Sequence, residues 1–441
     1  MAKNEAFDEE MDRREYRRKR RVRNQIISYI VFFIFLAALI VGAVFGISKL
    51  LTAAKDKKQA EELQKQLQEL SEMEEEPEVV EAPVESAEPV VEQDYLGEIV
   101  DAYIAEMPLE DKVAGLFMIT PEALTGTDTV IKAGDTTREK LSEHAVGGLI
   151  YFTKNFKDAE QLTEMLQNTK NWSKYPVFLG VDEEGGTVSR VAEAGLADNV
   201  GTMAEIGASG DAAVAREAGA AIGGYLSGYG FNMNFAPVAD VIVEGNTTIG
   251  DRSFGTDVNL VSPMTAAAVE GMQSSGVSAC LKHFPGLGDT TEDSHDGMAS
   301  SEKTLDDFNA TDFPVYQAGI GAGAEFVMVS HLSIPNVTGD NTPASMSSKV
   351  IAEILRGQLG YNGIVITDAM NMKAITEYYT SGDAAVTALQ AGADMILMPE
   401  NFEEAYNSVL EAVNNGTLTE ERIDESLKRI FRVKCKDKVE Q

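Results

Sequence analysis

Two short stretches of the sequence carry side chains that can transfer protons or attack carbon. The first, LKHFPGLGDTTEDSHDGMA at residues 281–299, sets Asp293 two positions before His295. In an extended segment these two side chains project to the same side, so the carboxylate can bond one imidazole nitrogen and orient the ring. The other nitrogen can then exchange a proton near neutral pH. The simpler alternative is a loop aspartate and histidine that only bond each other.

The second stretch, ITDAMNMKA at residues 366–374, places Asp368 directly after an apolar run. A carboxylate there can cap a helix that begins near Met370, or it can face a cavity as a nucleophile. Retaining glycoside cleavage needs one group that attacks the sugar carbon and another that protonates the leaving oxygen. Asp368 and His295 together meet that requirement.

Other polar residues occur in loops that suit the binding of hydroxyl groups. The loop GVDEEGGTVSR contains glycines that let the backbone approach a ligand, and it is acidic and lacks the GxxxxGK pattern of a phosphate loop. Carboxylate and guanidinium groups can each bond two adjacent hydroxyls. The candidates for substrate binding, from this loop, from IGDRSFG and from the first stretch, are Asp182, Arg190, Arg252, Lys282 and His283.

Eight apolar runs separate helical stretches in the sequence beyond Tyr95, and their continuous apolarity predicts strands buried on both faces. Eight parallel strands with intervening helices predict an α/β fold, a (β/α)8 TIM barrel, with an open doubly wound sheet as the alternative. The runs are GLFMI (115–119), GLIYF (148–152), VFLGV (177–181), NFAPVADV (234–241), SACLK (278–282), FVMVS (326–330), GIVIT (363–367) and DMILM (394–398).

Reactive side chains follow several of these runs at the point where the strand ends. Active sites of TIM barrels lie at the carboxyl ends of the strands, so this placement favours the barrel over the open sheet. The residues concerned are Asp182, Asp240, Lys282 with His283, His331 and Asp368.

The N-terminal quarter has a different composition. Residues 26–47 carry no charge and, as a helix, are long enough to cross a bilayer. The basic run RREYRRKRRVR precedes them, so the positive-inside bias predicts an uncleaved membrane helix with residues 1–25 as a cytoplasmic tail and the rest outside. A cleavable signal peptide is the alternative, although its apolar region would be shorter.

Two further segments connect this helix to the predicted barrel domain at residues 95–441. Leucines at helical spacing predict a short amphipathic helix at residues 48–74, and the acidic, proline-containing residues 75–94 are typical of a disordered linker.

The formal net charge is −34, and it argues against nucleic acid as a partner. Cys280 and Cys435 have no CxxC spacing and predict neither a disulfide framework nor a zinc site. The five Asn-x-Ser/Thr sites, such as Asn246-Thr-Thr, would matter only in a eukaryotic secretory pathway.

The motifs NFAPVADV, IGDRSFG, KHFPGLGDT with DSH, and ITDAMNMKA, in that order, resemble glycoside hydrolase family 3, and specifically its β-N-acetylglucosaminidase branch related to bacterial peptidoglycan recycling. The resemblance covers roughly residues 98–434. It implies that Asp368 is the nucleophile and that His295, paired with Asp293, is the general acid/base. It also implies that the five binding candidates surround the terminal sugar and its N-acetyl group.

Three positions depart from the family pattern. The family often has a histidine at the position of Leu287, an arginine at that of Thr187, and histidine or glutamine at that of Glu183. Leu287 is not among the matched catalytic positions. Thr187 and Glu183 lie beside the sugar-binding motif, so they bear on the preferred aglycone and the pH behaviour more than on the reaction class.

We therefore expect a membrane-anchored, outward-facing, exo-acting β-N-acetylhexosaminidase that needs no metal or cofactor and releases terminal N-acetylglucosamine, with peptidoglycan fragments as the expected source. The alternatives within the family are a β-glucosidase or a phosphorolytic enzyme. From another class, the alternative is a non-catalytic protein that binds wall glycan. The sequence leaves the oligomeric state open.

Overall fold

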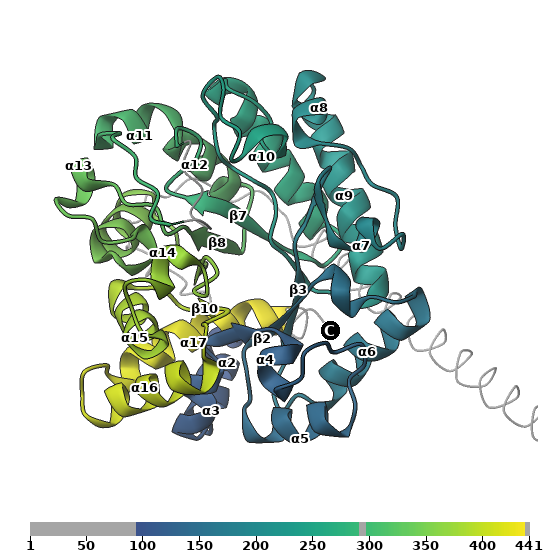
Figure 1. Cartoon of the computed structure of the whole chain (residues 1–441), viewed down its shortest axis with the longest axis vertical. Coiled ribbons are helices and arrows are strands. Elements are labelled where there is room, and N and C mark those ends of the chain that lie inside the picture. The colour runs from purple at the N-terminus through teal and green to yellow at the C-terminus, as the bar shows by residue number, and fades with distance from the viewer. Residues whose placement is uncertain (1–93, 291–296, 437–441) are drawn as a thin grey trace, which may run out of the picture. The chain divides into compact units, whose positions relative to one another are not determined.

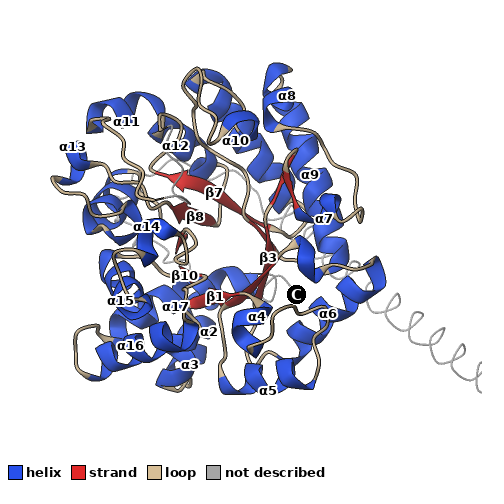
Figure 2. Cartoon of the chain, viewed as in Figure 1, coloured by secondary structure: helices blue, strands red, loops and turns tan. Residues whose placement is uncertain are grey.

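The computed structural model describes residues 94–290 and 297–436, and the predictions for the N-terminal quarter lie outside these residues. Eight parallel strands form the centre, and the helices lie outside them (Figure 1, Figure 2). In spatial order the strands are β10 (Ile396–Leu397), β1 (Phe117–Ile119), β2 (Gly148–Tyr151), β3 (Phe178–Val181), β6 (Met233–Asn234), β7 (Ser278–Phe284), β8 (Phe326–Val329) and β9 (Ile364–Thr367).

The sheet closes on itself. Strands β10 and β9 are the first and last in the spatial order, and a parallel bridge between Ile366 and Met395 joins them. Two backbone bonds support this junction, from Met395 N to the Val365 carbonyl (3.0 Å) and from Thr367 N to the Met395 carbonyl (3.1 Å). The closure favours the TIM barrel over the open sheet, and each of the eight predicted apolar runs contributes to the barrel wall.

Burial explains why the runs are continuously apolar. Every residue of β3, β8 and β9 is buried, because one face of each strand fills the barrel interior and the other packs under the helices. The fourth run departs from its predicted bounds. Its regular strand, β6, contains only Met233 and Asn234, and the chain beyond it rejoins the sheet through a single bridge between Val238 and Lys282.

The outer layer consists of short and long helices, with a small antiparallel hairpin, β4 (Glu183–Gly185) and β5 (Val188–Ser189), beside the barrel. The helices are α2 (Tyr95–Ala105), α3 (Leu109–Ala114), α4 (Pro121–Thr125), α5 (Asp135–Glu143), η1 (Thr153–Asn155), α6 (Ala159–Trp172), α7 (Arg190–Glu193), α8 (Met203–Ala208), α9 (Ala212–Tyr229), η2 (Gly250–Arg252), α10 (Val258–Gln273), α11 (Leu305–Thr311), α12 (Phe313–Gly321), α13 (Pro335–Thr338), η3 (Ala344–Met346), the π-helix η4 (Lys349–Gln358), α14 (Lys373–Thr376), α15 (Ser381–Ala391), α16 (Phe402–Asn414) and α17 (Glu420–Cys435).

Helix α9 shows how the sequence specifies such a crossover helix. Asp211 caps its first turn by accepting a hydrogen bond from Ala213 N (2.9 Å), and Gly230 ends it in the left-handed conformation. A Cβ atom at Gly219 would lie 2.4 Å from the Ala268 carbonyl oxygen, so glycine here lets α9 approach α10 closely. The alanine and glycine content of this stretch therefore reflects tight helix packing.

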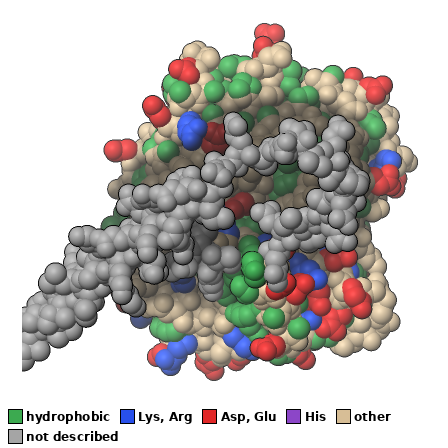
Figure 3. Space-filling model, turned by 180° about the vertical axis from the view of Figure 1, so that it is seen from behind, with side chains coloured by type: hydrophobic (Ala, Val, Ile, Leu, Met, Phe, Trp, Pro, Cys, Tyr) green, Lys and Arg blue, Asp and Glu red, His purple; other side chains and the backbone are tan. Residues whose placement is uncertain are grey.

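Within residues 94–290 and 297–436, no helix is both long enough and apolar enough to cross a membrane. The predicted membrane helix at residues 26–47 lies outside that part of the chain. On the face seen from behind, acidic side chains are spread among basic and apolar ones over the described surface (Figure 3). This distribution agrees with a solvated domain whose negative charge is dispersed.

Candidate active site

A pocket of about 420 Å³ opens at the carboxyl ends of the strands. All five predicted binding residues and the predicted nucleophile Asp368 line it. Asp293 and His295 lie outside the described residues, so the structure does not place the predicted acid/base pair. The remaining lining residues are Ile150, Phe152, Glu184, Val188, Thr248, Ile249, Leu287, Met328, Ala369, Asn371, Met372, Leu397 and Met398.

An ion network occupies one wall of this pocket. The Lys282 ammonium group lies 2.6 Å from Asp182 Oδ1 and 2.6 Å from Glu184 Oε1. Arg252 donates two hydrogen bonds to the Glu184 carboxylate, each 2.8 Å long, through its Nε and one terminal nitrogen. Arg252 and Lys282, which are 68 and 98 positions from Glu184 in sequence, are thereby fixed around one carboxylate.

The electrostatics of the network keep Glu184, Lys282 and Arg252 charged. Burial alone would raise the pKa of Glu184, but the charges and hydrogen bonds of Lys282 and Arg252 outweigh it and lower this pKa to about 2. Burial would likewise lower the pKa of Lys282 and of Arg252, but their carboxylate partners raise both above the ordinary values. The pocket therefore presents fixed charges that can bond sugar hydroxyls without changing protonation.

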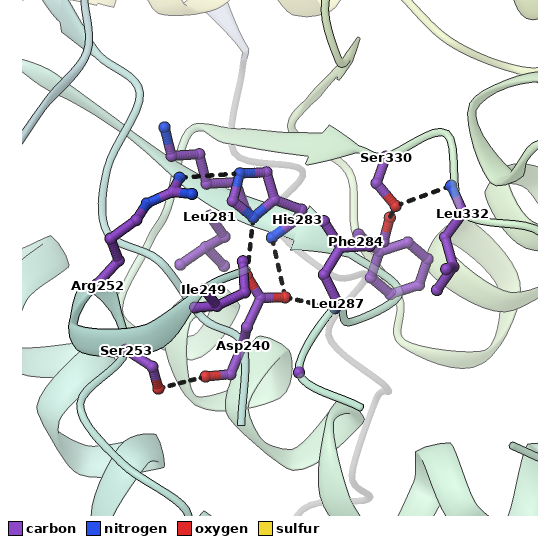
Figure 4. A network of polar contacts seen from close by, with 12 residues as sticks. Asp240, Ile249, Arg252, Ser253, Leu281, His283, Phe284, Leu287, Ser330 and Leu332 are labelled. Carbon is purple, nitrogen blue, oxygen red and sulfur yellow. Dashed lines mark hydrogen bonds and ion pairs between the residues drawn. The ribbon is translucent and has the colours of Figure 1, made fainter. Parts of the chain in front are cut away.

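His283 joins this wall to a second aspartate (Figure 4). Its Nδ1 lies 2.8 Å from Asp240 Oδ2, and its Nε2 lies 3.4 Å from a terminal nitrogen of Arg252. The other Asp240 oxygen accepts a hydrogen bond from Leu287 N (2.7 Å), and the Asp240 carbonyl accepts one from Ser253 Oγ (2.6 Å). Asp240 thus orients the imidazole through its Nδ1, which is the arrangement by which a carboxylate fixes a histidine tautomer.

Arg190 reaches the pocket from the start of α7. Its Nε is buried and has no hydrogen-bond partner among the described residues. A buried donor without a partner is costly, and a ligand oxygen in the pocket would satisfy it. Arg190 Nε is therefore a donor that a bound ligand could use.

Glu183 lies behind the pocket, although its neighbours Asp182 and Glu184 line it. It is fully buried and accepts hydrogen bonds from Val191 N (2.6 Å) and Ala192 N (3.0 Å) at the start of α7. Burial raises the pKa of this carboxyl. This departure from the family pattern therefore acts on the helix that carries Arg190 and makes no direct contact with the pocket.

Asp368 follows β9 and faces the pocket. Burial would raise its pKa, but the charges of His331 and His283 and the Ala369 N–H outweigh burial, so the pKa is lowered. Its Oδ1 accepts the hydrogen bond from Ala369 N (2.8 Å). The expectation of a helix beginning near Met370 is wrong, because α14 begins at Lys373 with Met372 as its N-cap. Asp368 is therefore not a helix cap.

His331 supports the loop that carries Asp368 and is itself fully buried. Its Nε2 donates to the Ala369 carbonyl (3.0 Å), and its Nδ1 lies 2.8 Å from Ser345 Oγ. The strand-end pattern predicted its position but not this contact.

Sequence reasoning underrated Glu184, which is the centre of the ion network. It also missed the apolar wall of Phe152, Met328, Met372 and Met398. The run of three acidic residues in VDEEGG was the available signal for Glu184. No signal in the sequence pointed to the methionines, since most methionines in such a chain belong to the core.

Comparison with known proteins shows which family has this barrel. The family model described as "Glycosyl hydrolase family 3 N terminal domain" matches residues 108–433. The chain belongs to glycosyl hydrolase family 3, as its motifs predicted.

Similar proteins carry names from the same branch of the family. Beta-hexosaminidase A of Pseudoalteromonas piscicida is 33% identical over 328 residues, which cover 68% of this chain and only 54% of the relative. Beta-hexosaminidase of Stenotrophomonas maltophilia (strain K279a) is 36% identical over 282 residues, which cover 62% of this chain and 82% of the relative. The solved structure of a glycoside hydrolase family 3 beta-N-acetylglucosaminidase from Paenibacillus sp. str. FPU-7 has a TM-score of 0.69 and 37% identity, covering 76% of this chain and 64% of that one.

Proposed function

We propose that this protein is an exo-acting, retaining β-N-acetylhexosaminidase that releases terminal non-reducing N-acetylglucosamine. The observation that carries the proposal is that Asp368, whose pKa is lowered by neighbouring charges, faces a pocket walled by Asp182, Glu184, Arg252 and Lys282. The names of the similar proteins support the sugar.

In the proposed mechanism, Asp368 attacks the anomeric carbon and forms a glycosyl-enzyme bond as the glycosidic C–O bond breaks. His295, oriented by Asp293, donates its proton to the departing oxygen. The same imidazole then takes a proton from water, which attacks the anomeric carbon and releases Asp368. A lowered pKa suits the nucleophile, because it must be ionised before the attack.

Each of the five predicted binding residues has a role in the proposed mechanism. Asp182 accepts hydrogen bonds from sugar hydroxyls, and Arg190, Arg252, Lys282 and His283 donate to hydroxyl or acetamido oxygens. These groups are held in place before substrate arrives, so little ordering is required on binding.

We further propose that the substrate comes from peptidoglycan and that the enzyme faces outward from a membrane. The uncharged residues 26–47 after a basic run support the anchor, and the family resemblance supports the glycan. Membrane fractionation of the full chain, with and without residues 1–47, tests the anchor. Recovery of both forms in the soluble fraction would contradict it.

The activity is tested first with an aryl N-acetyl-β-glucosaminide, whose cleavage releases a chromophore. Purified muropeptides, with the anomeric configuration of the released sugar followed by NMR, then test the sugar, the bond and retention together. Absence of turnover by the folded wild-type protein, or inversion of configuration, would overturn the proposal. Faster turnover of a β-glucoside would indicate the glucosidase alternative, and formation of a sugar phosphate in added phosphate would indicate phosphorolysis.

A non-catalytic wall-binding protein is separated by the same preparation. Binding to sacculi without any sugar release would favour it. Asp368→Asn is the matched control, since it keeps the shape of the side chain and removes the proposed nucleophile.

A further inference from the structure

Asn246 lies in the loop between β6 and η2 and is only 6% exposed. Its Oδ1 accepts a hydrogen bond from Ile249 N (2.9 Å). Its Nδ2 donates to the carbonyl oxygens of Gly288 (3.0 Å) and Thr290 (2.7 Å). One buried amide therefore joins two loops that are more than 40 positions apart in sequence.

The first of these loops carries a binding residue. Ile249 lines the pocket, and its carbonyl accepts a hydrogen bond from Arg252 N (3.1 Å) at the 3-10 turn η2. The bond from Ile249 N to Asn246 fixes the start of that turn, as an asparagine side chain does when it bonds a backbone N–H a few residues further on. Asn246 therefore helps to set the position of the Arg252 guanidinium.

The second loop is the turn that follows β7. Leu287 lines the pocket there, and the chain continues through Thr290 to the residues that we propose as acid/base. The two loops are in close contact at this point, because Val243 N donates to the Gly288 carbonyl (2.9 Å) and a Cβ atom at Gly288 would lie 1.8 Å from the Val241 carbonyl oxygen. The turn carbonyls thus face Asn246 at fixed positions.

We propose that Asn246 is a positioning residue that holds the Arg252 loop against the turn at residues 287–290. It thereby fixes Gly288 and Thr290, after which the sequence continues to the proposed acid/base residues Asp293 and His295. The inference rests on the proposed glycosidase function. Asn246 also begins the sequence Asn-Thr-Thr, but a buried amide with both of its polar atoms in use is not an acceptor for a glycan.

Asn246→Asp tests the contact with the turn while it keeps the contact with the Arg252 loop. Aspartate keeps an oxygen for Ile249 N–H but loses the amide donor for Gly288 and Thr290, so the turn loses these two bonds while the Arg252 loop stays bonded. Asn246→Ser, with a neutral hydroxyl that can reach the same N–H, is the second variant if the charged one does not fold. Asn336→Asp is the matched control, since Asn336 is exposed and, among the described residues, its Nδ2 bonds only Glu302.

The measurement is kcat and KM for aryl N-acetyl-β-glucosaminides with good and poor leaving groups. For Asn246→Asp we expect kcat to fall at least about tenfold with the poor leaving group, less with the good one, and KM to stay within about twofold. Poor leaving groups depend most on protonation, so this pattern reports a displaced acid. Asn336→Asp should match the wild type.

An equal fall for both leaving groups, or wild-type kinetics in a folded Asn246 variant, would overturn the inference. If neither Asn246 variant folds while Asn336→Asp does, Asn246 is a folding residue and the inference is also overturned. Failure of the proposed function looks different, because the wild-type protein would then turn over none of these substrates.

Discussion

Two buried ion networks lie at opposite ends of the same barrel. At the carboxyl end, Glu184 is shared by Arg252 and Lys282 and the network forms a pocket wall. At the amino end, just before β10, fully buried Asp394 accepts hydrogen bonds on one oxygen from Ser426 Oγ (2.8 Å) and Arg429 (3.0 Å). Its other oxygen bonds Val365 N (2.9 Å) and Arg356.

The two networks differ in whether protein groups satisfy all of the polar atoms around them. The Asp394 network joins β9, η4 and α17, and both carboxylate oxygens have protein partners. The network around Glu184 borders the pocket, and the Nε of nearby Arg190 has no hydrogen-bond partner in the part of the chain that the structure describes. Similar ion pairs thus join elements of the fold at one end and form a pocket wall at the other, because both oxygens of Asp394 bond protein groups whereas the Glu184 network borders the pocket.

Asp368→Asn should abolish catalysis in the pocket at the carboxyl end of the barrel without weakening the fold. We expect kcat to fall by at least about 10⁴-fold, because an amide cannot form the glycosyl-enzyme bond. The thermal midpoint should stay near that of the wild type. Turnover within tenfold of wild type would remove Asp368 from the role of nucleophile.

Asp394→Ala should do the opposite. Removal of this carboxylate leaves the guanidinium groups of Arg356 and Arg429 without their shared partner, which costs about 4 kcal/mol of unfolding free energy. Denaturant unfolding measures this loss, and KM of the folded fraction should not change. A variant that keeps its stability but loses substrate affinity would contradict the division between the two ends.

Acid should weaken the mouth network in a defined pH range. The folded-state pKa of Glu184 is about 2, below its ordinary value of 4.5, so its stabilisation is present above pH 4.5 and is lost as pH falls toward 2. The full difference corresponds to roughly 3 kcal/mol. The stability gap between wild type and Glu184→Gln should therefore shrink as pH falls, and a gap that does not change between pH 6 and pH 3 would contradict this.

An exposed ion pair gives the smallest effect and serves as a baseline. Lys349 and Glu353 are one helical turn apart in η4, and both side chains are largely exposed. Because solvent screens such a pair, Glu353→Gln should cost only about 0.4 kcal/mol in chemical denaturation. A loss as large as that of Asp394→Ala would show that burial does not explain the difference between the networks.

Much of the barrel could be predicted because its signal is local. Each apolar run overlaps a strand, although the fourth shares only Asn234 with β6, and α9 lies in one of the helical stretches that separate the runs. The predicted helix start near Met370 failed, since the chain first makes a loop in which Asp368 faces the pocket. Propensity alone does not reveal a loop that is held by His331 from a neighbouring strand end.

The candidate site divides in the same way. The strand-end pattern predicted four residues that line the pocket, Asp182, Lys282, His283 and Asp368, because parallel strands in a barrel end at the same face. It did not show that Glu184 joins Arg252 to Lys282, or that Glu183 turns away from the ligand. Those contacts depend on the hairpin β4–β5 and its distance from β7.

The sequence by itself determined the positions of the strands along the chain, the family and the residue types at the strand ends, since short contiguous motifs specify each of them. Only the tertiary structure decided which charges pair, which donors stay open for a ligand and where Asn246 links two loops. These depend on distances between residues 40 to 100 positions apart, and the closing of the barrel sets such distances.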